Sequence, residues 1–142
     1  MPLPALLAAA LGLACMACTS QQTAAPEGSA AGLASDVHVT EVALGSEVGL
    51  DKKVKQPKDV FAPEDTVYVS VVTQGRSSDT VLTARFRQGG TVVQEIAQSI
   101  APDGSATSEF HVSKPGGLAR GEYEVEVLVE GRPVEKRRFT VQ

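Results

Sequence analysis

Residues 122–129 read EYEVEVLV, and this stretch holds the most regular alternation of apolar and charged side chains in the chain. Alternation with a period of two is typical of a β-strand that packs one face on a core and turns the other to solvent. The side chains that we expect to point inward are Tyr123, Val125, Val127 and Val129. Leu128 and the three glutamates are expected to point outward. The stretch therefore predicts one half-buried strand of an all-β domain.

Six further stretches within residues 36–142 show similar alternation and are bounded by Gly, Pro, Asp or Ser. They are residues 36–44, 66–73, 80–88, 91–100, 105–112 and 134–141. The apolar phase of the first shifts between Val39 and Val42, which indicates a β-bulge. Gly89 and Gly90 supply the positive φ that a tight hairpin requires. Residues 74–79 (QGRSSD) are expected to form a turn.

Seven strands without a helical period predict an all-β fold, a seven-stranded antiparallel immunoglobulin-like sandwich. In this topology the strand at 122–129 lies between those at 80–88 and 134–141. The outward positions of these two neighbours include the basic side chains of Arg85, Arg87, Lys136 and Arg138. We therefore interpret the glutamates of residues 122–129 as one side of a set of cross-strand ion pairs, and not as a cation or acid–base site.

Residues 118–123 (LARGEY) resemble the tyrosine corner of fibronectin type III and related domains. The resemblance implies that the hydroxyl of Tyr123 bonds a nearby backbone group and that Leu118 packs beside its ring. The segments FAPEDTVYVSV and EFHVSKPGGLARGEYEVEV also resemble an Ig-like domain of uncharacterised bacterial lipoproteins. That likeness implies a fold and a location, and it implies no activity.

The N-terminus has a different composition, because no charged side chain precedes Glu27 and residues 3–17 form an unbroken apolar run. About fifteen residues suit an export signal, whereas a membrane-spanning helix needs roughly 20. The run ends in Cys15 and Cys18, and it resembles a bacterial lipoprotein signal. The resemblance implies a signal peptide at residues 1–18, with lipid on Cys18 or, alternatively, on Cys15. A secretory signal cut after Ala17 or Ala25, without lipid, is the other interpretation.

Residues 19–35 consist mainly of Ala, Ser, Gly, Thr, Gln and Pro with a single charge, and they predict a flexible tether. The tether precedes an Ig-like domain at residues 36–142. The lipoprotein resemblance implies a bacterial cell envelope location with the lipid anchor in a membrane. Thr19, in the place where an aspartate would direct retention, favours the outer membrane facing the periplasm.

Composition argues against several kinds of chemistry. A net charge of −4 disfavours nucleic-acid binding, which needs clustered Lys and Arg. His38 and His111 are the only histidines and have no ligand-like neighbours, so we expect neither a metal nor any other cofactor. Residues 36–142 hold no cysteine and no G-x-S-x-G motif, so an enzyme is not expected.

Two surfaces are candidate binding sites. The long connection at residues 45–63 carries a basic cluster, namely Lys52, Lys53, Lys55 and Lys58. It is either a solvated loop or a site for anionic lipid, cell-wall polymer or an acidic protein surface. A second, mildly apolar face is predicted to display Tyr68, Val72, Thr107 and His111. The strand at residues 91–100 is placed where it can also cover part of that face.

These observations predict a lipid-anchored envelope protein that acts as a non-catalytic protein-interaction module, with an envelope protein of unknown identity as its partner. A carbohydrate- or peptidoglycan-binding module is the alternative, disfavoured because sugar sites use exposed aromatic side chains and the chain has no tryptophan. An enzyme with an unrecognised site is the third hypothesis.

Overall fold

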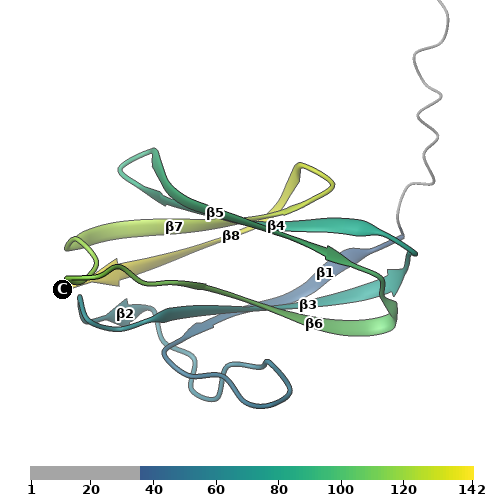
Figure 1. Cartoon of the computed structure of the whole chain (residues 1–142), viewed down its shortest axis with the longest axis horizontal. Helices are drawn as coiled ribbons and strands as arrows, with labels where there is room; N and C mark the ends of the chain where they lie inside the picture. Colours follow the sequence, from purple (N-terminus) through teal and green to yellow (C-terminus); the bar gives the residue numbers. More distant parts are fainter. Residues whose placement is uncertain (1–35) are drawn as a thin grey trace, which may run out of the picture. The chain divides into compact units, whose positions relative to one another are not determined.

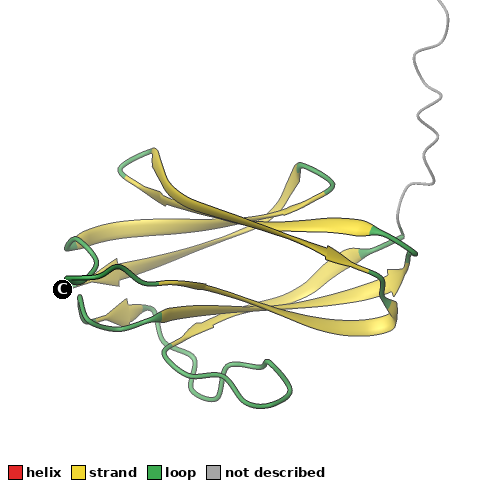
Figure 2. Ribbon diagram, in the orientation of Figure 1, coloured by secondary structure: helices red, strands yellow, loops and turns green. Residues whose placement is uncertain are grey.

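The computed structural model describes residues 36–142, which form eight β-strands and no helix (Figure 2). The strands are β1 (His38–Gly45), β2 (Val60–Phe61), β3 (Val67–Arg76), β4 (Thr80–Gln88), β5 (Thr91–Ile100), β6 (Asp103–Val112), β7 (Gly121–Val129) and β8 (Arg132–Val141). The all-β class is confirmed, whereas the expected number of seven strands is wrong. The extra strand is β2, which at two residues is too short to show any alternation.

The strands form two sheets that lie face to face (Figure 1). One sheet has the order β1-β3-β6, and the other has the order β2-β8-β7-β4-β5. Every pair is antiparallel except β2 and β8, which run parallel, so the expectation of a wholly antiparallel arrangement is wrong at that edge. As the sequence predicts, β7 lies between β4 and β8.

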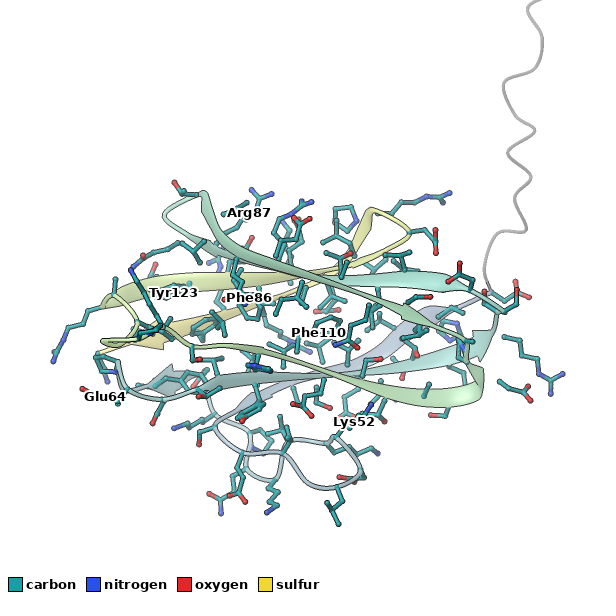
Figure 3. All side chains as sticks on the ribbon, viewed as in Figure 1. Lys52, Glu64, Phe86, Arg87, Phe110 and Tyr123 are labelled. Atoms are coloured by element: carbon teal, nitrogen blue, oxygen red, sulfur yellow. The ribbon has the colours of Figure 1, made fainter. Side chains whose placement is uncertain are left out.

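The core fills the space between the sheets. Phe86 of β4 and Phe110 of β6 approach it from opposite sides and are fully buried (Figure 3). Toward one end, Phe139 stacks on Tyr123 with ring centroids 5.0 Å apart and meets the edge of Phe61 at 5.5 Å. The inward positions of β7 are all buried, as its alternation predicts. The two faces thus share one hydrophobic cluster.

The predicted turn at residues 74–79 is too long. β3 continues to Arg76 because β6 starts two residues earlier than predicted, at Asp103, and pairs with it through Gly75 and Gly104. The guanidinium of Arg76 lies 2.9 Å from the Asp103 carboxylate at the end of this ladder. Gly75 has a φ of +135°, a conformation that side chains with a Cβ rarely adopt. That glycine allows the strand to extend where polar residues predict a turn.

Two register shifts decide which side chains reach the core. One lies between Val39 and Glu41 of β1, which confirms the predicted bulge. The other lies at Phe86 in the β4–β5 pair, next to a hairpin in which Gly89 and Gly90 both have positive φ. The alternation of residues 91–100 predicts Val92 on the core face with Ile96 and Ile100, but beyond this second shift Val92 is exposed, so that expectation is wrong.

The outer face of β7 is more buried than its alternation predicts. Only 4% of the surface of Glu126 and 2% of that of Leu128 is exposed to solvent. Leu128 pairs with Thr83 on one side and Pro133 on the other, where the β7–β8 register shifts. The β4–β5 and β7–β8 hairpins also bend away from the opposite sheet at this face (Figure 1). Within residues 36–142, no helix has the length and apolarity needed to cross a membrane.

Candidate binding site

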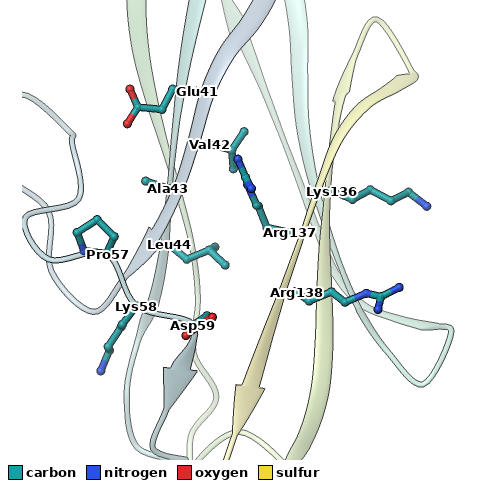
Figure 4. Close-up of a pocket in the computed structure, with 10 residues that line it drawn as sticks. All are labelled: Glu41, Val42, Ala43, Leu44, Pro57, Lys58, Asp59, Lys136, Arg137 and Arg138. Carbon is teal, nitrogen blue, oxygen red and sulfur yellow. The ribbon is translucent and has the colours of Figure 1, made fainter.

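A cleft of about 640 Å³ separates two strands that border the same side of the domain, β1 and β8 (Figure 4). One wall is residues 41–44 of β1, the other is residues 136–138 of β8, and residues 57–59 close one end. On the opposite side of the domain, β5 and β6 are linked by a hydrogen bond of 2.8 Å from the Gln98 amide to the Glu109 carbonyl. In the described domain, a hydrogen bond therefore links the two sheets on the β5–β6 side, whereas a cleft separates them on the β1–β8 side.

Along residues 136–138, on the edge of β8 that faces the cleft, the backbone N–H and C=O groups have no strand partner in the described domain; the other edge pairs with β7. Thr140 donates its N–H to the Asp59 carbonyl at 2.8 Å, so this N–H points away from β7. Alternate residues of a strand direct their N–H and C=O groups to the same edge, which places those of Lys136 and Arg138 on this edge too. β2 pairs with β8 through Val60 and Phe61 alone, and no other strand in residues 36–142 continues the ladder.

Arg137 occupies a position on the inner face of β8. It pairs with Val125 of β7, whose side chain is fully buried, and the next inward residue along the strand is Phe139. Its side chain extends across the cleft toward Val42 of β1 (Figure 4). The guanidinium lies 3.8 Å from Glu135, which is also on the inner face, and half of the side chain stays exposed. A charged side chain is tolerated at this inward position because the cleft leaves it half exposed to solvent.

Lys58 at the end of the cleft is held by local contacts. Its ammonium lies 2.9 Å from the Asp65 carboxylate and 4.8 Å from the centre of the Phe61 ring. Asp65 also accepts the backbone N–H of Ala62 at 3.0 Å. The Lys58 bond, followed by the Ala62 bond, lowers the pKa of Asp65 below its ordinary value. Lys58 therefore fixes the loop beside β2.

The other lysines of the predicted cluster lie on a separate feature, the hairpin at residues 46–56. Val48 and Val54 form a bridge in this hairpin, and Gly45 and Pro57 form another at its base. Lys55 is ion-paired with Glu47. Lys52 and Lys53 lie near the tip, and both are exposed. The structure thus divides the basic cluster between the cleft and the hairpin.

The second predicted surface is on the outer face of the β1-β3-β6 sheet. Tyr68 and His111 are cross-strand partners whose ring centroids lie 5.7 Å apart. Thr107 is half-buried, and Val72 is buried, so Val72 adds little to the exposed surface. Because β5 pairs with β4 in the other sheet, the strand at 91–100 does not cover this face.

Ion pairs cover the outer face of the five-stranded sheet. Glu126 lies 3.1 Å from Arg85, 3.5 Å from Arg87 and 3.4 Å from Lys136. Glu124 faces Lys136 at 3.5 Å and Arg138 at 3.7 Å. The sequence pattern missed Glu95 of β5, which lies 2.6 Å from Arg85; this bond is the first cause of a raised Arg85 pKa.

The hydroxyl of Tyr123 donates a hydrogen bond of 2.8 Å to the carbonyl of Ala119, four residues upstream. Burial raises the pKa of this phenol, and the bond opposes the rise. Leu118 is buried in the same cluster, and its N–H donates to the Pro63 carbonyl at 2.7 Å. These contacts fix the segment that leads into β7.

The predicted lipidation site lies outside the described part of the chain, and no metal site was predicted. Among residues 36–142, no three His, Cys, Asp or Glu side chains are grouped closely enough to hold a metal ion. Cys15, Cys18 and the predicted tether at residues 19–35 lie outside the described residues. The cleft was not predicted, although the signal was in the sequence: residues 135 and 137 are charged at positions where the alternation of 134–141 calls for apolar side chains.

No family model matches the chain, and no curated protein matches it either. Among solved structures, an immunoglobulin-like protein from Pseudomonas aeruginosa has a TM-score of 0.52, with 14% identity over 75% of this chain and 97% of that one. This likeness concerns the fold, and it supports an immunoglobulin-like β-sandwich.

Two enzyme structures contain similar folds. The alkylpurine DNA glycosylase AlkC of Pseudomonas fluorescens, bound to DNA containing an abasic site analogue, has a TM-score of 0.51 and 14% identity over 78% of this chain. A β-glucosidase involved in saponin metabolism from intestinal bacteria has the same TM-score and identity over 77%. The match spans 31% of AlkC and 16% of the β-glucosidase. Both likenesses again concern the fold alone.

Proposed function

We propose that this chain is a non-catalytic protein-interaction module of the bacterial cell envelope, anchored by lipid on Cys18 in the outer membrane and facing the periplasm. Its binding site is the cleft between β1 and β8. The observation that carries the proposal is the unpaired backbone of Lys136 and Arg138 beside a cleft whose wall holds Arg137. An immunoglobulin-like domain on a lipid anchor supports the same role.

The partner binds by adding an extended segment to β8. Exposed N–H and C=O groups at a sheet edge pair with another strand, and such main-chain bonds provide affinity without regard to side chains. Specificity comes from the side chains beside the edge. Arg137 faces the cleft with half of its side chain exposed, so an acidic side chain of the partner can form a bidentate pair with it. The partner segment is therefore extended and acidic.

The same arginine excludes other segments. A charge on the inner face of an edge strand opposes pairing with an apolar strand, because the Arg137 side chain would lose water while its contact with Glu135, at 3.8 Å, is too long to serve as a bidentate partner. An acidic segment supplies that partner. Arg137 thus both discourages unspecific sheet extension and selects the intended ligand.

The contacts of the aromatic side chains argue against a sugar-binding site. Sugars stack on exposed rings. In the described domain the buried rings are those of Phe61, Phe86, Phe110, Tyr123 and Phe139. Tyr68 is half-buried against His111. A protein partner therefore fits this surface better than a polysaccharide does.

The test is photo-crosslinking in the living bacterium, with a photoreactive amino acid at position 134. Val134 is exposed on β8, two residues before the segment 136–138 that lines the cleft. We expect one protein adduct, and we expect Arg137→Glu to reduce its yield at least tenfold by repelling an acidic segment. Arg120→Glu, on an exposed loop outside the cleft, is the matched control and leaves the yield unchanged.

Two further variants separate the parts of the proposal. Arg138→Pro removes an N–H from the unpaired edge, leaves the β7 ladder intact and loses an ion pair whose arginine is 86% exposed, so it lowers the adduct yield while the domain stays folded. Cys18→Ser abolishes incorporation of labelled fatty acid, whereas Cys15→Ser does not. An adduct to peptidoglycan, or equal yields for Arg137→Glu and Arg120→Glu, contradicts the assigned site.

A further inference from the structure

The tip of the hairpin at residues 46–56 presents an apolar side chain to solvent. Leu50 is fully exposed, more so than any other large apolar residue of the described domain. The other exposed residues of this kind are valines that keep about half of their surface covered. Scattered exposed apolar residues are common on proteins. A leucine with no covering contact at the end of a projecting hairpin is a more specific feature.

The hairpin tip is structurally fixed, and so is the position of Leu50. Gly49 donates its N–H to the Lys53 carbonyl at 2.8 Å, and Lys52 donates back to the Gly49 carbonyl at 3.0 Å. The Asp51 carboxylate accepts the N–H of Lys53 at 3.2 Å. Lys52 adopts a positive φ of 63°, which closes the turn. Binding through this tip therefore costs little ordering of the backbone.

Positive charge is concentrated around the tip. Residues 46–56 carry three lysines and two acidic residues, whereas the rest of 36–142 carries ten basic and fourteen acidic side chains. Within the hairpin, Glu47 pairs with Lys55, and Asp51 binds a backbone N–H. Within residues 36–142, no carboxylate lies within 4 Å of the ammonium of Lys52 or Lys53. An apolar tip with basic neighbours is thus set on an otherwise acidic domain.

We propose that this tip docks on an anionic lipid surface, with Leu50 entering the headgroup region and Lys52 and Lys53 contacting lipid phosphates. A leucine gains free energy from leaving water at the boundary of the acyl chains, and a polysaccharide offers no comparable apolar surface. Each lysine near an anionic bilayer strengthens binding about fivefold. One leucine and two or three lysines give a weak contact that becomes effective when the domain is already held at the membrane.

The membrane is within reach of the hairpin. This step rests on the proposed lipid on Cys18. Seventeen residues, 19–35, separate that cysteine from the described domain, and an extended chain of that length spans at most about 60 Å. The lipid anchor alone tethers the domain, and the hairpin contact also determines which side of the domain faces the bilayer. The cleft is formed by other residues, so the contact does not require the cleft to be occupied.

The test is acetylation of lysines on the full chain reconstituted in lipid vesicles, read by mass spectrometry. One vesicle contains phosphatidylglycerol and phosphatidylethanolamine, and the other contains phosphatidylcholine alone. We expect acetylation of Lys52 and Lys53 to fall at least threefold on the anionic vesicle relative to the neutral one. Lys114, an exposed lysine on a different loop, is the matched control and does not change.

Two variants and one competitor decide between interpretations. Leu50→Asp abolishes the protection, whereas Val134→Asp, at an exposed apolar residue of another hairpin, leaves it intact. Equal acetylation on both vesicles, or protection that survives Leu50→Asp, overturns the lipid contact. Equal protection by soluble polyglutamate identifies an acidic polymer as the ligand and also overturns it. Photo-crosslinking through position 134 is a separate readout, so failure of the lipid contact is distinguishable from failure of the proposed protein binding.

Discussion

The carboxylate of Glu126 lies 3.1 Å from the guanidinium of Arg85, its cross-strand neighbour in the β4–β7 pair. Glu126 is almost completely buried, although it is on the face of β7 that points away from the core. Three long basic side chains cover it, from β4 on one side and β8 on the other. One carboxylate therefore joins the three central strands of the five-stranded sheet.

Replacing Glu126 by glutamine is expected to lower the free energy of unfolding by about 1–3 kcal/mol, because its basic partners lose their shared carboxylate. Partial exposure of those partners keeps the loss below that for a fully buried pair. The measurement is the urea midpoint at constant m-value. Glu122→Gln, at an exposed position on the same face, shifts stability by less than about 0.5 kcal/mol. Equal effects at the two positions would show that the cluster is not a stabilising unit.

Replacing Tyr123 by phenylalanine is expected to cost about 1 kcal/mol, because the Ala119 carbonyl loses its hydrogen-bond donor. The raised pKa of the phenol adds a pH dependence. Its contribution to stability is fully present below the ordinary tyrosine pKa of about 10 and is lost as pH rises through the folded-state pKa. The difference between wild type and variant therefore shrinks above pH 10, as measured by thermal unfolding. A difference that grows with pH would refute the assignment.

The contribution of Asp65 to stability depends on pH in the opposite sense to that of Tyr123. Its pKa is lowered by Lys58 and by the Ala62 N–H, so its stabilising contribution is present above its ordinary value near 4 and is lost as pH falls through the folded-state pKa. Asp65→Asn is expected to destabilise the domain at pH 6 and to converge with wild type in acid. Urea unfolding across pH 2–6 measures this. Glu64→Gln, at the exposed neighbouring position, is the control and should follow wild type throughout.

Gly75→Ala is expected to lower stability by about 2 kcal/mol or more. An added Cβ would lie 2.4 Å from the Asp36 carbonyl oxygen, and the backbone φ of +135° already disfavours a side chain. Gly90→Ala is the matched comparison, because Gly90 has a positive φ of 82° but open space around it. That variant should lose about 1 kcal/mol. Similar losses at both sites would exclude the close approach of Asp36 as a cause.

The regular part of the fold was predictable because each long strand alternates between a core face and a solvent face. β4 and β5 occur at the predicted residues, and the bulge in β1 was readable from a shift in apolar phase. β2 was not predictable, since two residues carry no period. The burial of Glu126 was not predictable either, because it depends on the reach of side chains from both neighbouring strands.

The cleft illustrates a different limit. Its origin is the missing neighbour of β8 along residues 136–138, and a sequence pattern describes one strand without showing where its partner ends. The charges at Glu135 and Arg137 were readable as an interruption of the inward positions. The topology, which a single strand's pattern does not show, places Arg137 opposite β1 across the cleft. The lysine cluster was likewise readable, but its division between the cleft and the hairpin depends on the bridges at Val48 and Gly45.

The most direct test of the proposed binding mode is amide hydrogen exchange of Lys136 and Arg138. In the free protein both amides point to the unpaired edge of β8, so they should exchange rapidly, whereas that of Arg137 pairs with β7 and should be protected. In the complex recovered from the envelope, strand addition predicts strong slowing at Lys136 and Arg138. Rapid exchange of both amides in the bound state would contradict the account.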